Sequence, residues 1–255
     1  MPPLEFPYQV ASYSCPLVNP PAQRHLFLNK VHNLQLAIGR MQGLVLAGDA
    51  EFSFWRQALK PVARNGYREG AMFINHRVTT SMGGGLCQLS GLLYNLALLS
   101  GCVITERFNH SIDAYGESRY IPLGRDATVA YGRKNLRFRN PYGFALRLEL
   151  AVDEQSASGI VRAERPLPHA ITIETMLLET LPPPVRQVLD RKVPPGAEET
   201  EEGLTGKIVQ AWRLTTTAAG ATSKAQLSRD HYHATPTLVR RYAPAPLPWL
   251  SRLFG

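Results

Sequence analysis

A run of three glycines, Gly83–Gly85, followed at once by a leucine-rich segment, constrains the fold of this chain more than any other feature. Glycine loses the most backbone freedom when it is ordered, so the run fits a tight turn better than the interior of a helix or strand. The segment after it predicts a buried helix, because leucines recur at spacings of three and four, at Leu89, Leu92, Leu93, Leu96 and Leu99. Gly101 stands where a left-handed helix cap would fall. Cys87 is therefore expected in the first turn of this helix.

That position gives Cys87 a chemical interpretation. The first turn of a helix carries unpaired backbone N–H groups and a partial positive charge, and both stabilise a thiolate, the nucleophilic form of cysteine. The N–H groups of Gly84 and Gly85, with the side chain of Gln88, are candidate donors to the oxyanion of an attacked carbonyl. The alternative is that Cys87 is a small buried residue that packs beneath the helix. The local pattern leaves both interpretations open.

A candidate proton carrier for Cys87 follows in the chain. Residues 102–108 alternate apolar and polar side chains as a half-buried strand does, and His110 lies just beyond them. A helix and the strand after it are usually neighbours, so His110 can return to the helix start and act as general acid and base. The alternative is a histidine satisfied by backbone hydrogen bonds. Asp126 either orients His110 or forms an ion pair with Arg125.

Composition narrows the class of protein. With 255 residues, 44% hydrophobic and 19% charged, the chain is typical of a globular protein with a sizeable core. No apolar run is long enough to span a membrane. Three cysteines without a Cys-x-x-Cys spacing argue against a disulfide framework and a cysteine-rich zinc site. His231 and His233 are a candidate metal pair, but no third ligand is evident, so we expect no metal and no cofactor.

Charge and the N-terminus bear on partners and location. The formal net charge is +8, and basic residues concentrate between Arg119 and Arg147, which suits an anionic substrate or a solvated face. No nucleic-acid-binding motif accompanies them, so we do not favour a nucleic-acid partner. Residues 1–14 have neither a basic start nor a continuous apolar stretch. The sequence as written therefore predicts a cytoplasmic protein, and an envelope-associated one if its start is misassigned.

The pattern of elements predicts an α+β fold in two parts. Residues 1–157 form a mixed domain with an irregular N-terminal arm over residues 1–21, a helix over 21–41, a strand over 71–78 and a β-hairpin over 136–150. Residues 158–255 form a smaller all-β module, with strands over 171–175, 206–214, 225–232 and 237–242, a solvated acidic loop over 181–203 and a proline-rich tail from 243. The tail either docks on a partner or membrane surface or folds back on the body.

An ordered series of motifs resembles the VanW family. It comprises Gly48 with Glu51-Phe52-Ser53-Phe54, Gly66-Tyr67, Gly83-Gly84-Gly85-Leu86-Cys87-Gln88-Leu89-Ser90 with Leu93-Tyr94-Asn95, Glu106-Arg107 with His110-Ser111, Gly124-Arg125-Asp126-Ala127-Thr128-Val129, and Phe138 with Asn140. Together they cover roughly residues 29–150. The resemblance implies a VanW-like domain and, more loosely, the small β module that follows it in some exported relatives.

The resemblance implies envelope or peptidoglycan biology and an L,D-transpeptidase-like reaction. The Cys87 thiolate would attack a stem peptide of peptidoglycan and form a thioester, with His110 as acid and base. Arg107 or Arg125 would hold a substrate carboxylate. Ser90 and Ser111 join the candidate substrate-binding or oxyanion residues, as members of the matched motifs. The alternative is a non-catalytic accessory protein, linked to glycopeptide resistance, that binds cell-wall fragments or a partner. The oligomeric state does not follow from the sequence.

Overall fold

The structure is a computed structural model that describes residues 4–17, 23–74, 77–116 and 119–243. Its helices are α1 (Arg24–Gly39), α2 (Phe54–Ala58), the 3-10 helix η2 (Ala63–Asn65) and α3 (Leu86–Leu99). None of these helices combines the length and the apolar composition that crossing a bilayer requires. The mixture of helices with several antiparallel sheets confirms the predicted α+β class.

The largest sheet covers α3 and contains the N-terminal segment. Its strand order is β1 (Tyr8–Pro16), β9 (Ser156–Ala163), β8 (Leu146–Val152), β2 (Val45–Leu46). The prediction of an irregular arm is wrong for residues 8–16, which form β1. Prolines occur only before this stretch and at its last residue, so they do not interrupt the hydrogen bonds with β9. Residues 18–22 and the start of the predicted helix lie outside the described residues, and α1 otherwise agrees with the helical pattern.

Two smaller sheets complete the first part of the chain. One has the order β3 (Glu51–Ser53), β7 (Arg137–Arg139), β6 (Val103–Glu106), and the other pairs β4 (Glu69–Ile74) with β5 (Arg77–Met82). The predicted single strand over 71–78 is therefore two paired strands, and the predicted hairpin over 136–150 is wrong. β7 and β8 belong to different sheets, because the buried Asn140 side chain donates hydrogen bonds to the carbonyl oxygens of Leu46, Ala47 and Phe144 and turns the chain between them.

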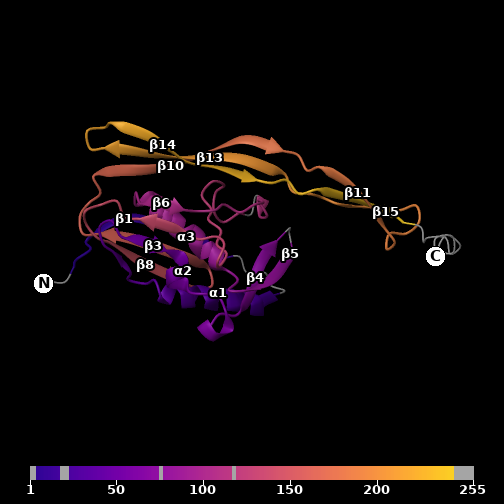
Figure 1. Cartoon of the computed structure of the whole chain (residues 1–255), viewed down its shortest axis with the longest axis horizontal. Coiled ribbons are helices and arrows are strands. Elements are labelled where there is room, and N and C mark those ends of the chain that lie inside the picture. Colours follow the sequence, from indigo (N-terminus) through magenta and orange to yellow (C-terminus); the bar gives the residue numbers. More distant parts are fainter. Residues whose placement is uncertain (1–3, 18–22, 75–76, 117–118, 244–255) are drawn as a thin grey trace.

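The C-terminal part is all β, as predicted. One sheet has the order β10 (His169–Leu181), β13 (Gly206–Thr217), β14 (Thr222–Tyr232), and a second has the order β11 (Val185–Asp190), β15 (Thr237–Tyr242), β12 (Glu198–Glu201). The predicted acidic loop over 181–203 thus contains β11 and β12, whose pairing with distant β15 leaves no local signal. In Figure 1 the first of these sheets lies along the body, and β11 and β15 extend beyond it.

Two sequence predictions, the domain boundary and the proline-rich tail, stay predictions. The predicted division between residues 157 and 158 falls inside β9, which pairs with β1 and β8 of the first part. The division into two domains remains a prediction, but any boundary must lie after Ala163. The proline-rich tail from residue 244 onward lies outside the described residues.

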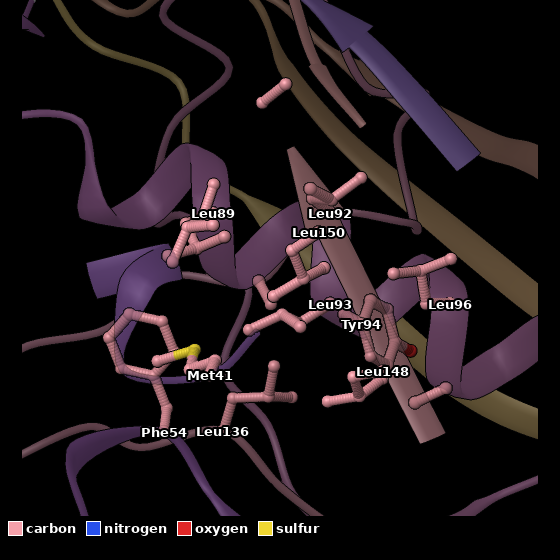
Figure 2. Close-up of a cluster of buried hydrophobic side chains, with 14 of the residues drawn as sticks. Met41, Phe54, Leu89, Leu92, Leu93, Tyr94, Leu96, Leu136, Leu148 and Leu150 are labelled. Atoms are coloured by element: carbon pink, nitrogen blue, oxygen red, sulfur yellow. The ribbon is translucent and has the colours of Figure 1, made fainter. Parts of the chain in front are cut away.

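Helix α3 is the centre of the core. Its leucines Leu89, Leu92, Leu93 and Leu96 are fully buried, and they pack with Met41, Phe54, Leu136, Leu148 and Leu150 (Figure 2). The helix ends as predicted, with Gly101 at a φ of 77° and the N–H of Cys102 donated to the carbonyl oxygen of Ala97. Burial of this helix on all sides fixes the position of its first turn, and hence of Cys87.

The glycine run forms the turn that joins β5 to α3. Gly83 and Gly85 have φ angles of 77° and 103°, which glycine adopts without strain. Gly84 has ordinary backbone angles, yet a Cβ there would lie 2.5 Å from the carbonyl oxygen of Gly70. The fully buried Asn33 of α1 donates a hydrogen bond to the carbonyl oxygen of Gly84 at 3.1 Å. The turn is therefore clamped between α1 and β4.

Replacing Gly84 by alanine tests this clamp. The added Cβ meets backbone and not a flexible side chain, so we expect Gly84→Ala to lower the free energy of unfolding by about 1–3 kcal/mol. Gly39→Ala is the matched control, because nothing lies within 4 Å of a Cβ at Gly39 and its φ is not positive. That change should be neutral or stabilising by up to about 1 kcal/mol. Urea denaturation measures both, and equal effects of the two variants would contradict the clamp.

Candidate active site

Cys87, His110 and Asp126 come together at the start of α3. Cys87 and His110 line the same pocket, His110 is the group that lowers the pKa of the Cys87 thiol, and Cys87 Sγ lies 3.4 Å from Oγ1 of Thr128. His110 Nδ1 lies 2.6 Å from Oδ2 of Asp126, and the His110 backbone N–H donates to the same oxygen at 2.8 Å. Because Nδ1 is held by Asp126, the other ring nitrogen is free to face the thiol. A catalytic triad uses the same three side-chain types as nucleophile, base and orienting acid, and we call Cys87, His110 and Asp126 the triad for this arrangement.

The electrostatics of the site favour a thiolate–imidazolium pair. Burial opposes ionisation of Cys87, but the hydrogen bond and charge of His110 outweigh it and lower the pKa of the thiol to about 7. Burial likewise opposes the charge on His110, but Asp126 and Cys87 raise its pKa to about 10. The pKa of Asp126 falls to about 2 despite burial, chiefly through its hydrogen bond with His110. At neutral pH a substantial share of the Cys87 thiol is thus ionised, which is the reactive form of cysteine.

The C-terminal module supplies part of this site. Tyr232, on β14, donates its O–H to Oδ1 of Asp126 at 2.5 Å and accepts the N–H of Gly124 at 2.9 Å. Asp230, on the same strand, accepts a hydrogen bond from the buried Arg107, which also donates to the carbonyl oxygen of Asp126 at 2.7 Å. Sequence reasoning missed Asp230 and Tyr232, and no local pattern marks them, because they follow Asp126 by about a hundred residues.

A pocket of about 510 Å³ opens onto the triad. Cys87, His110 and Asp126 line it, together with the glycine turn. Aromatic side chains contribute much of the remaining wall, from Trp55, Tyr115, Tyr120 and Tyr131. Lys30 and Arg119 add positive charge, and the sequence analysis named neither as a site residue. The volume and the mixed apolar and cationic lining suit a peptide-sized segment with an anionic group.

The oxyanion candidates divide into two groups. Gln88 lines the pocket, but its Nε2 donates to the carbonyl oxygen of Pro16 at 2.7 Å, so its amide holds β1 against α3 and does not point donors at a substrate. The N–H of Gly84 is donated to Ser81 at 2.9 Å. Among the described residues, the N–H groups of Gly85 and Cys87 have no backbone or side-chain acceptor. These two N–H groups at the helix start are the available oxyanion donors.

The two arginines of the sequence prediction lie outside the pocket lining. Arg107 is taken up by Asp126 and Asp230 and lies over the ring of Tyr94. Arg125 donates to Oδ1 of Asn95 at 2.7 Å, so Asp126 is held by His110 and not by its neighbour in sequence. The structure thus does not bring the predicted carboxylate-binding arginines to the reacting thiol, because both are committed to fixing the loop that carries Asp126.

The two serines differ in position. Ser90 is fully buried and donates to the carbonyl oxygen of Ala127 at 2.6 Å, which ties α3 to the segment after Asp126. Ser111 lines the pocket, and its carbonyl oxygen accepts the N–H of His233 from the C-terminal module at 2.7 Å. Ser111 therefore stays a candidate substrate contact, whereas the Ser90 hydroxyl is occupied by the backbone.

The remaining cysteines and histidines lie apart from this chemistry. Cys15 and Cys102 are buried free thiols, and burial raises the pKa of both, for Cys102 to about 11. The rings of His231 and His233 lie 4.2 Å apart between centroids. Within the described ranges, no three His, Cys, Asp or Glu side chains are placed to hold a metal ion.

Comparison with known proteins gives one consistent family. The family described as "VanW like protein" matches residues 29–161. The chain is 32% identical over 138 residues to the vancomycin B-type resistance protein VanW of Enterococcus faecalis, covering 54% of this chain and 50% of that protein. It is 30% identical over 114 residues to the uncharacterized protein YoaR of Bacillus subtilis, covering 45% and 36%. The chain thus spans at most half the length of these relatives.

Among solved structures, the G5 domain of an IgA1 protease aligns with 30% of this chain and 92% of its own, at 17% identity and a TM-score of 0.25.

The pH dependence of alkylation tests the state of Cys87. Because the thiolate reacts with iodoacetamide, the rate at Cys87 should rise through half its maximum near pH 7, well below roughly 8.5 for an ordinary cysteine. Cys15 and Cys102 serve as internal controls and should stay unmodified in this range, since both are buried with raised pKa values. Peptide mass spectrometry of the folded protein separates the three. A Cys87 that reacts no faster than Cys15 at any pH would contradict the ion pair.

Asp126→Asn tests the orienting carboxylate. Loss of its charge removes a group that raises the pKa of His110, so the imidazolium weakens and no longer favours the thiolate. We expect the alkylation midpoint of Cys87 to move to higher pH by about 1 unit or more. Asp49→Asn makes the same chemical change at an exposed residue and should leave the midpoint in place. An unchanged midpoint in Asp126→Asn would mean that Asp126 does not act on the thiol through His110.

Proposed function

The chain belongs to the VanW family, and we propose that it is a cysteine acyltransferase that acts on stem peptides derived from peptidoglycan. The observation that carries this proposal is that Cys87 lines a peptide-sized pocket with His110, which lowers the pKa of the thiol and is itself held at Nδ1 by Asp126. A thiol that packs passively beneath a helix needs neither an oriented histidine nor a lowered pKa. Buried Cys15 and Cys102, which have raised pKa values, provide that comparison within the same chain.

The first step is acylation of Cys87. The thiolate attacks the carbonyl carbon of the amide after the third residue of the stem peptide, and a C–S bond forms. His110, which already holds the proton that the thiol lost, gives it to the amide nitrogen as the C–N bond breaks. The terminal residue leaves as a neutral amine, and the remaining peptide is held as a thioester on Cys87.

The second step returns the enzyme to its starting state. The amine of a second stem, or water, attacks the thioester carbonyl and gives up one proton to His110. The C–S bond breaks, and the thiolate and the imidazolium are restored together. An amine acceptor yields a cross-linked peptide, and water yields a shortened one. Asp126 keeps the imidazole oriented through both steps, since Nδ1 stays bonded to Oδ2.

Both steps pass through a tetrahedral oxyanion. The N–H groups of Gly85 and Cys87 are the donors that the helix start leaves without acceptors among the described residues. Such donors contribute most where they are fixed before the charge appears. The glycine turn meets that requirement, because Gly84 is packed against Gly70 and held by Asn33. Backbone N–H groups therefore donate the hydrogen bonds to the oxyanion, and the side chain of Gln88, also predicted as a donor, is not needed for them.

The choice of peptidoglycan peptides rests on the family. A relative that shares 32% identity with this chain is named a vancomycin B-type resistance protein. Glycopeptide resistance concerns the peptide stems of the cell wall, so a chain of this family with an acyl-transfer site has a substrate of matching chemistry there. The pocket agrees with this class, since it combines aromatic walls with the cationic side chain of Lys30.

Mass spectrometry of the intact protein with a synthetic stem tetrapeptide tests the proposal. The wild-type protein should gain the mass of the tripeptide acyl group at Cys87. Cys87→Ala should lose the adduct and at least about a thousandfold of the turnover, and His110→Gln about a hundredfold or more. Cys102→Ala, at a buried thiol outside the pocket lining, is the matched control and should acylate as the wild type does.

The alternative of a non-catalytic binder makes a different prediction. A binder holds the peptide with the same affinity before and after Cys87→Ala and forms no adduct in either case. That result, in a protein shown to be folded, would overturn the acyltransferase proposal.

A further inference from the structure

Lys30 is a cation that the triad does not use. It lies on α1 and lines the same pocket as Cys87. A Cβ at Gly85, two residues before the nucleophile, would lie 2.7 Å from Cγ of Lys30, so its side chain runs directly against the glycine turn. Among the described residues its ammonium has neither an ion pair nor a hydrogen bond, and the ionisable group that acts on its charge is the buried thiol of Cys15.

Each of the other charged side chains that line the pocket has a partner of opposite charge. Asp113 accepts from Arg119 at 2.8 Å and from Lys207 at 2.6 Å. Asp126 is bonded to His110, which in turn balances the Cys87 thiolate. Among the described residues of the lining, Lys30 is therefore the charged side chain that has no ion-pair partner, and the ionisable group that acts on its charge is the buried Cys15 thiol.

An uncompensated and partly buried ammonium is costly. Burial lowers the pKa of Lys30 to about 8, because surroundings of low polarity disfavour its charged form. The group is still mostly protonated at pH 7. A methionine of similar length would pack there without that cost. Residues that lower stability in this way are common at functional sites, where a ligand supplies the missing partner.

We propose that Lys30 binds the C-terminal carboxylate of the acyl-donor peptide, on the residue that is released when Cys87 is acylated. The inference rests on the proposed function, and it replaces the arginines expected from the sequence. Arg107 and Arg125 are engaged with Asp126, Asp230 and Asn95 and lie outside the pocket lining. A carboxylate is the one common peptide group that both neutralises an ammonium and stands at the end of the chain.

The first test needs no substrate and compares two alkylating agents at Cys87. Iodoacetate carries a carboxylate and iodoacetamide does not, so their rate ratio at pH 7 reports a cation near the sulfur. Lys30→Met should lower the iodoacetate-to-iodoacetamide ratio about tenfold. Lys60→Met removes the same charge from an exposed site over Tyr131, at the pocket wall, and should change the ratio less than about twofold. An equal effect of both variants would overturn the role of Lys30.

Folding is checked alongside. Lys30→Met should melt at or above the temperature of the wild type, since it removes an unpaired buried charge. Should that variant fail to fold, Lys30→Gln carries the same test, and Lys30→Arg should retain most of the wild-type ratio.

The second test separates this proposal from the proposed function. Stem tetrapeptides with a free C-terminal carboxylate and with a C-terminal amide are compared as acyl donors. The wild type should prefer the acid about tenfold, and Lys30→Met should lose that preference by slowing only the acid. Adduct formation with an unchanged acid-to-amide ratio in Lys30→Met would overturn the carboxylate assignment alone. A carboxylate-dependent alkylation ratio without any peptide adduct would keep the anion site and overturn the acyltransferase.

Discussion

The carboxylate of Asp126 is the interaction on which the rest of the site depends. One oxygen receives both the ring and the backbone N–H of His110, and the other receives Tyr232 and Arg107. These partners come from separate parts of the chain, so a single buried charge fixes the base, the loop that carries it and the strand that covers it. A carboxylate with this many donors stays ionised far into acid, which keeps the imidazole in one orientation.

Helix α3 provides the rigid side of the arrangement. All its leucines except the half-buried Leu99 are buried, and its first turn is held by the preceding glycine turn and by Gln88, which donates a hydrogen bond to β1. Cys87 is therefore placed by packing, whereas His110 and Asp126 are placed by hydrogen bonds on irregular backbone. The division is physically sensible, because a nucleophile needs a fixed position and a proton carrier needs a fixed orientation.

The parts of this molecule that sequence predicted are those set by local pattern. Periodicity located α3 and its Gly101 cap, and the rule that neighbouring elements pack together paired His110 with Cys87. Alternation found β7 and β8 but not their partners, since pairing depends on the buried Asn140 and on sheets formed by distant strands. Tyr232 and Asp230 lay beyond prediction for the same reason. In sequence, Arg107 and Arg125 cannot be told from arginines that bind substrate. Only the structure shows that Asp126, Asp230 and Asn95 already occupy their guanidinium groups.

The contacts that β14 makes with Arg107 and Asp126 determine which segment of this protein would have to be expressed to keep the site intact. The segment that matches the family ends at residue 161, before the strand that carries Asp230 and Tyr232 begins. Expressed alone, that segment would contain Cys87, His110 and Asp126. It would lack Asp230, which pairs with Arg107, and Tyr232, which donates a hydrogen bond to Asp126. In this chain, the segment that identifies the family ends before the segment whose side chains hold Arg107 and Asp126 in place.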